Sequence, residues 1–96
     1  MSLRLALVED DPGLRAEYGV IAGADPDIEL VGAYPSAEEA LAALPALEPD
    51  AVLMDINLPG MTGIECVRRL KAVTPAAQVV MLTAIGDSDA VFESLK

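Results

Sequence analysis

The chain contains the stretch Asp50-Ala51-Val52-Leu53-Met54-Asp55, in which an unbroken apolar run ends directly at a carboxylate. An apolar run without alternating polar positions predicts a strand that is buried on both faces, and such strands are typical of parallel sheets. Shortly after this stretch, Asn57-Leu58-Pro59-Gly60 has the composition of a loop. We therefore expect a parallel sheet in which one strand carries Asp55 at its carboxyl end.

Three further strands are expected, two before this one in the sequence and one after it. The first ends at the acidic run Glu9-Asp10-Asp11, and the last ends at the hydroxyl of Thr83. The second carries Asp27 and Glu29, whose charges favour an edge position in the sheet. Strands and helices alternate four times along the chain, which predicts an α/β fold with right-handed crossovers. The three further strands are expected at residues 3–8, 28–33 and 78–83.

Helices are expected between the strands, and most have a recognisable start signal. Asp11 is an N-cap candidate because proline follows it, whereas Ser36 and Thr62 each precede a glutamate at the spacing of a capping box. Pro45 is expected to end or kink the second helix. The third helix has apolar residues at helical spacing, namely Ile64, Val67, Leu70 and Val73. A fourth helix is expected after Asp89, and it contains the apolar residues Ala90, Val91, Phe92 and Leu95.

Composition limits the kind of protein this can be. The chain has 96 residues, enough for one small domain, and its hydrophobic fraction of 53% is ample for a core. A formal net charge of -10 argues against direct binding of nucleic acid or an anionic membrane by this domain. No apolar run approaches the roughly 20 residues of a membrane span. Cys66 is the only cysteine, so a disulfide within the chain is excluded and a reducing, cytoplasmic setting fits.

The polar residues at the strand ends form the candidate site. Ligands of open α/β sheets bind outside the carboxyl ends of the strands, where the strand order reverses. If the first and third strands are neighbours, Glu9, Asp10 and Asp55 converge at one position. Carboxylates packed together repel one another, and a hard cation such as Mg²⁺ relieves this repulsion. Because the chain has no histidine, zinc or copper is a poor fit, and we expect a magnesium site.

A carboxylate beside such a cation has the chemistry of a covalent phosphate acceptor. The hydroxyl of Thr83 could donate to a phosphoryl oxygen, and the small Ala84 leaves room for a phosphodonor. A phosphatase with an aspartate nucleophile is a competing interpretation, but it requires a general acid two residues later, where Asn57 cannot transfer a proton. A nucleotide-binding domain is disfavoured because no glycine-rich loop follows the first strand.

Three segments together resemble the receiver domain of two-component response regulators, over essentially the whole chain and in matching order. The resemblance implies an open parallel sheet in the flavodoxin-like strand order 2-1-3-4. It also implies a cytoplasmic signalling protein that accepts a phosphoryl group from a phosphohistidine on a sensor kinase, and whose output domain binds DNA in many members. The segments are Val8-Glu9-Asp10-Asp11-Pro12, residues 52–63 with the sequence VLMDINLPGMTG, and Val80-Met81-Leu82-Thr83-Ala84.

The resemblance also implies a role for each site residue. Glu9 and Asp10 match the acidic pair of the family, with Asp10 as the direct metal ligand. Asp55 matches the phosphorylated residue and a further Mg²⁺ ligand, and the backbone carbonyl of Asn57 matches the third protein ligand. Thr83 matches the hydroxyl that reorients toward the phosphoryl group. Such a domain is a phosphoacceptor that promotes its own phosphotransfer and dephosphorylation, and it is not a conventional enzyme.

The sequence departs from the family at its carboxyl end. Receivers have a fifth strand, which carries a lysine and an aromatic switch residue, and a fifth helix, whereas this sequence corresponds to a receiver that stops in the fourth helix. Lys96 lies on that expected helix and is not assigned the lysine role. We therefore expect residues 1–96 to be an incomplete receiver whose fourth strand is an exposed edge, which favours association of two copies. A receiver used only for phosphorylation-independent protein interactions is the alternative.

Overall fold

A four-stranded parallel sheet in the order β2-β1-β3-β4 forms the centre of the computed structural model, which describes residues 2–55, 58 and 60–82. The predicted strand order is therefore confirmed. The fourth helix predicted after Asp89 lies outside the described residues. The elements are β1 (Leu3–Val8), α1 (Pro12–Gly23), β2 (Ile28–Tyr34), α2 (Ala37–Leu47), β3 (Ala51–Asp55), α3 (Gly63–Val73) and β4 (Gln78–Leu82).

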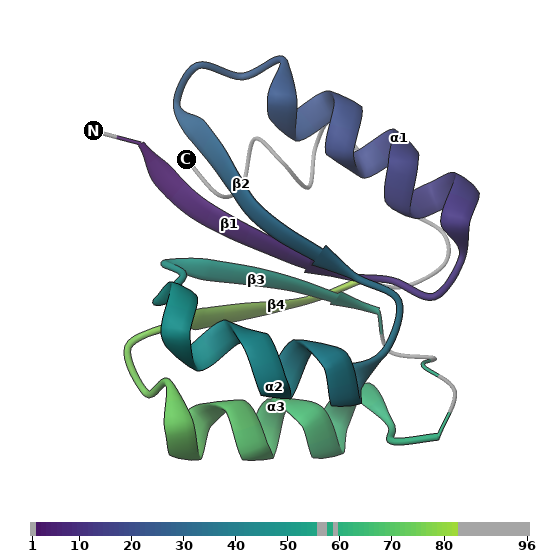
Figure 1. The fold of residues 1–96 in the computed structure, drawn as a ribbon, viewed down its shortest axis with the longest axis vertical. Helices are drawn as coiled ribbons and strands as arrows, with labels where there is room; N and C mark the ends of the chain where they lie inside the picture. Colours follow the sequence, from purple (N-terminus) through teal and green to yellow (C-terminus); the bar gives the residue numbers. More distant parts are fainter. Residues whose placement is uncertain (1, 56–57, 59, 83–96) are drawn as a thin grey trace.

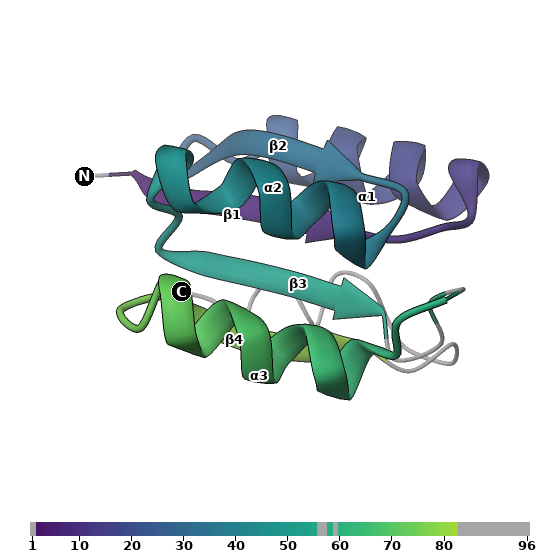
Figure 2. The same ribbon diagram turned by 60° about the horizontal axis from the view of Figure 1, so that its bottom comes forward.

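The helices cover the two faces of the sheet. Figures 1 and 2 show α2 and α3 side by side on one face and α1 on the opposite face. Each face has its own core, because successive strand residues point to opposite sides. Leu5, Leu7 and Leu53 pack with residues of α1, whereas Val8 and Met54 pack with residues of α2 and α3. This arrangement leaves the carboxyl ends of the strands as the edge at which polar residues can gather.

Burial explains the position of each strand in the sheet. In β3, Ala51, Val52, Leu53 and Met54 are all at most 2% exposed, as expected for a central strand covered on both faces. The β2 strand begins with buried Ile28 and exposed Glu29, and it forms an edge of the sheet, as its charged residues predicted. At the other side, β4 is the last strand of the sheet within the part of the chain that the structure describes. Association of two copies through β4 stays a prediction.

The expectation that Pro45 ends or kinks the second helix is contradicted in its first part. Pro45 does not end α2, which continues to Leu47 and closes where the Glu48 backbone N–H donates to the Leu44 carbonyl at 3.2 Å. The proline ring removes one backbone donor but can be accommodated in the last turn, where few further helical bonds depend on it. Glu48 then adopts a left-handed backbone conformation with φ 48°, which terminates the helix.

The third helix buries only part of its apolar residues. Ile64 and Val73, two of the four apolar residues at helical spacing, are 74% and 54% exposed. Gly63, Cys66 and Leu70 instead face the core. Because four apolar residues span more than one helix face, spacing alone did not identify the face in contact with α2.

No helix in the described residues has the length and apolar character needed to cross a membrane.

Replacing Ser36 with alanine is expected to destabilise the domain by about 1 kcal/mol, because Ser36 is the N-cap of α2. Its Oγ accepts a hydrogen bond from the Glu39 backbone N–H at 3.2 Å. Urea denaturation followed by circular dichroism would measure the loss. Ser36→Asp retains an acceptor at this position and is expected to remain close to the unsubstituted protein. An equal loss in both variants would contradict a capping role.

Candidate functional site

Strand register places Glu9 and Asp55 next to each other at the carboxyl edge of the sheet. Val8 pairs with Met54 in the parallel ladder between β1 and β3, so the following residues occupy equivalent positions. Alternation along each strand also directs these two side chains to the side occupied by Leu7 and Leu53. In the sheet, β2 pairs with one side of β1 and β3 pairs with the other side. The site at the ends of β1 and β3 therefore lies at the point where the strand order reverses.

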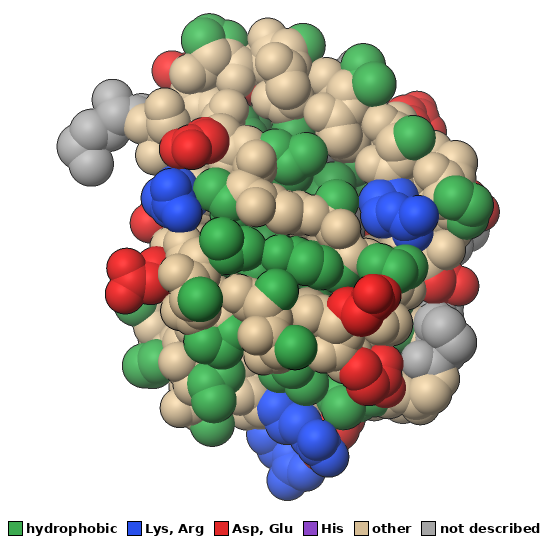
Figure 3. Space-filling model, in the orientation of Figure 1, with side chains coloured by type: hydrophobic (Ala, Val, Ile, Leu, Met, Phe, Trp, Pro, Cys, Tyr) green, Lys and Arg blue, Asp and Glu red, His purple; other side chains and the backbone are tan. Residues whose placement is uncertain are grey.

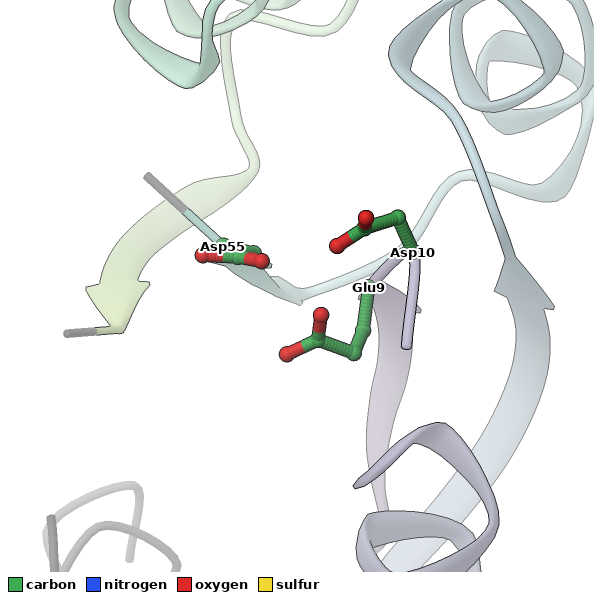
Figure 4. A group of neighbouring side chains, drawn as sticks. All are labelled: Glu9, Asp10 and Asp55. Carbon is green, nitrogen blue, oxygen red and sulfur yellow. The ribbon is translucent and has the colours of Figure 1, made fainter. Parts of the chain in front are cut away.

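Three carboxylates converge at this point. Glu9, Asp10 and Asp55 each offer one oxygen, and these oxygens lie within 4.8 Å of one another. Figure 4 shows the three carboxyl groups directed toward a common region beyond the ends of β1 and β3. Glu9 is only 4% exposed, whereas Asp10 is exposed and Asp55 is half-buried. The predicted convergence of these residues is therefore present.

The protonation of Glu9 reflects this crowding. The pKa of Glu9 is raised from 4.5 to about 7, mainly by burial and also by its side-chain hydrogen bond to Asp55 and the negative charge of Asp55. The Asp11 backbone N–H donates to Glu9 Oε2 at 3.2 Å and opposes this increase. Near neutral pH Glu9 is therefore partly protonated, and a divalent cation would displace that proton. This arrangement fits a hard cation with oxygen ligands.

Backbone contacts hold the acidic loop in place. The Glu9 N–H donates to the Tyr34 carbonyl at 3.0 Å, which joins the loop to the end of β2. The Asp11 side chain accepts from the backbone N–H groups of Gly13 and Leu14 at 2.8 and 3.1 Å. Asp11 is therefore the predicted N-cap of α1. These contacts fix the exit of β1 relative to the helix that follows it.

Sequence reasoning missed one contact of the acidic loop. Arg15 Nη1 donates to the backbone carbonyl of Glu9 at 2.9 Å. The available signal was an arginine in the first turns of the helix that follows the acidic run, but it did not specify which acceptor this side chain would reach. Three other predicted site residues, Asn57, Thr83 and Ala84, lie outside the described residues.

The fold and the acidic cluster together define the receiver class of α/β domains. A parallel sheet in this order with carboxylates at its switch point is the arrangement that the resemblance implied. The family model of the response regulator receiver domain matches residues 5–96, and the chain belongs to this family. It is a receiver of two-component signal transduction.

Two curated relatives illustrate the range of proteins with this domain. The chain is 38% identical over 82 residues to a protein-glutamate methylesterase/protein-glutamine glutaminase of Syntrophus aciditrophicus, covering 85% of this chain and 23% of that protein. It is 32% identical over 93 residues to the DNA-binding transcriptional activator DevR/DosR of Mycobacterium tuberculosis, covering 97% of this chain and 43% of that protein. The chain therefore spans less than half of each relative, and the activities in their names describe longer proteins.

Solved structures agree with this assignment. The response regulator domain of Thermotoga maritima CheB superposes with a TM-score of 0.81 at 26% identity, covering 99% of this chain and 72% of that one. A LuxR-family two-component response regulator from an Aurantimonas species gives 0.82 at 29% identity, covering 99% and 68%. The similarity thus extends over nearly the whole chain.

Proposed function

We propose that Asp55 accepts a phosphoryl group from a phosphohistidine on a sensor kinase. An Asp55 carboxylate oxygen would attack phosphorus, forming a P–O bond while the P–N bond breaks and the imidazole leaves. Asp55 is half-buried at the end of β3, so its carboxylate can be approached from outside the sheet. The observation that supports this proposal best is the convergence of Glu9, Asp10 and Asp55 within 4.8 Å.

We further propose that the cluster binds Mg²⁺ through Asp10, Asp55 and the backbone carbonyl of Asn57, with Glu9 completing the acidic site. Bound Mg²⁺ would offset the charge of the carboxylates and of the incoming phosphoryl oxygens. Thr83 would contact the phosphoryl group, and Ala84 would leave access to the site. An output domain that binds DNA is one fit for this receiver, since DevR/DosR is named a DNA-binding activator.

Incubation with acetyl phosphate and Mg²⁺, followed by intact mass spectrometry, tests the proposed function. We expect a mass gain of one phosphoryl group, and we expect EDTA to abolish it because the carboxylates alone repel an anionic donor. A matched incubation with inorganic phosphate, which is not an activated donor, should give no gain. If acetyl phosphate gives no adduct at any Mg²⁺ concentration, the phosphorylation-independent interaction module becomes the better account.

A further inference from the structure

Arg15 connects α1 to the acidic loop through its side chain. Its Nη1 atom donates to the Glu9 carbonyl at 2.9 Å, and the side chain is half-buried. The Arg15 backbone N–H donates to the Asp11 carbonyl at 2.9 Å, within the first turn of α1. The arginine is thus fixed at both ends, by the helix and by the loop.

Glu9 is held at each of its polar groups by a different residue. Its N–H donates to the Tyr34 carbonyl, its carboxylate accepts from the Asp11 N–H, and its own carbonyl accepts from Arg15. The carbonyl of Glu9 belongs to the peptide bond that leads into Asp10. Fixing that carbonyl therefore restricts the orientation of the peptide between the two acidic residues.

We propose that Arg15 is a positioning residue for the cation site, acting through the Glu9–Asp10 peptide. This inference rests on the proposed Mg²⁺ site. With the peptide fixed in advance, Glu9 and Asp10 present their carboxylates beside Asp55 without an ordering cost on binding. Without the guanidinium, the part-buried Glu9 carbonyl loses its charged donor, and the loop gains alternative conformations.

The charge of Arg15 makes the proposal distinguishable from a purely electrostatic effect. A guanidinium bound to the Glu9 carbonyl carries a positive charge beside the acidic loop and disfavours a second cation, so removing its charge alone would tighten Mg²⁺ binding. Removing its positioning contact would weaken Mg²⁺ binding. The two explanations therefore predict changes of opposite sign for the same substitution.

Isothermal titration with Mg²⁺ measures this sign on the whole chain. We expect Arg15→Met to weaken Mg²⁺ binding by about 10-fold, as for other residues that orient metal ligands. We also expect faster hydrogen exchange at the Asp10 and Asp11 amides of the metal-free variant. Arg15→Lys, which retains the charge and one donor, is expected to recover part of the affinity. Affinity equal to or tighter than that of the unsubstituted protein in Arg15→Met would overturn the proposal.

Arg4→Met is the matched control. Arg4 Nη2 donates to the Leu47 carbonyl at 2.7 Å, so this substitution removes the same charge and the same kind of bond, together with a partly exposed ion pair to Glu29 at 3.7 Å. Arg4 lies on β1, whose opposite end leads to the acidic loop, and its variant should bind Mg²⁺ like the unsubstituted protein. An equal loss in Arg4→Met would overturn a specific role for Arg15.

Folding and the proposed function are checked separately. If circular dichroism shows that Arg15→Met does not fold, Arg15→Gln, which is too short to reach the carbonyl, replaces it under the same criteria. If the unsubstituted protein binds no Mg²⁺, the proposed metal site fails together with this inference. Mg²⁺ binding that is strong in the unsubstituted protein and unchanged in the Arg15 variants refutes only the positioning role.

Discussion

An Asp55→Asn variant is expected to gain no phosphoryl group from acetyl phosphate at any Mg²⁺ concentration. An amide has no anionic oxygen to attack phosphorus, and the substitution also removes one of the three converging carboxylates. The same change should lower the pKa of Glu9, because the hydrogen bond and the negative charge of Asp55 are two causes of its increase. Intact mass spectrometry measures the first effect, and carboxyl chemical shifts followed against pH measure the second.

Asp50→Asn is the matched control for this prediction. Asp50 precedes β3 at the opposite end of the strand that carries Asp55, where its Oδ2 accepts from the Arg4 backbone N–H at 2.8 Å. The same chemical substitution is made there without altering the acidic cluster, so we expect an unchanged rate of adduct formation. If Asp55→Asn is phosphorylated as fast as the unsubstituted protein, another residue is the acceptor.

The sheet and the convergence of its carboxylates could be predicted from the sequence because both depend on local patterns. An apolar run buried on both faces, such as Val52 to Met54, has few interpretations other than a central strand. The ending of such runs at Glu9 and at Asp55 then determines which side chains share the carboxyl edge, once β1 and β3 are neighbours. Because paired parallel strands run in the same direction, residues that follow their last paired positions lie close together.

The features that could not be predicted depend on contacts between elements. The exposure of Ile64 depends on which face of α3 packs against the sheet and α2, and all four apolar positions of this helix were plausible choices. Pro45 is accommodated because α2 closes only two residues later, which local propensity does not specify. The acceptor of Arg15 is a backbone carbonyl, and every residue offers one, so no sequence signal identifies it.

The metal-free protein is expected to lose stability as the pH rises from about 5 to 8, because Glu9 must ionise in a buried site. The pKa of Glu9 is about 7 in the folded chain and 4.5 as its ordinary value. Between these values the folded state binds more protons than the unfolded state, so the free energy of unfolding decreases as pH increases. The stabilisation is fully present below pH 4.5 and is lost as pH rises through 7.

Other shifted groups contribute outside this pH window. Arg68 and Arg69 lower the pKa of Glu65, so its contribution is lost only when the pH falls below its ordinary value of 4.5. Burial raises the pKa of Cys66 to about 11, above the window. We expect Glu9 to account for on the order of 1–2 kcal/mol, less than the full linkage value because solvent screens part of the cluster.

Urea denaturation at pH 5.5 and pH 8 measures this effect, with Glu9→Gln as the control that cannot ionise. The variant should lack the decline between the two pH values, because its amide is uncharged at both. Mg²⁺ at pH 8 should restore stability to the unsubstituted protein, since a cation that binds only the folded state stabilises it by mass action. An equal decline in Glu9→Gln would assign the pH dependence to general charge repulsion. Protons and Mg²⁺ are expected to compete for the same carboxylate oxygens. If Glu9→Gln removes the loss of stability at pH 8 but Mg²⁺ does not reverse it, the titrating group lies outside the cation site.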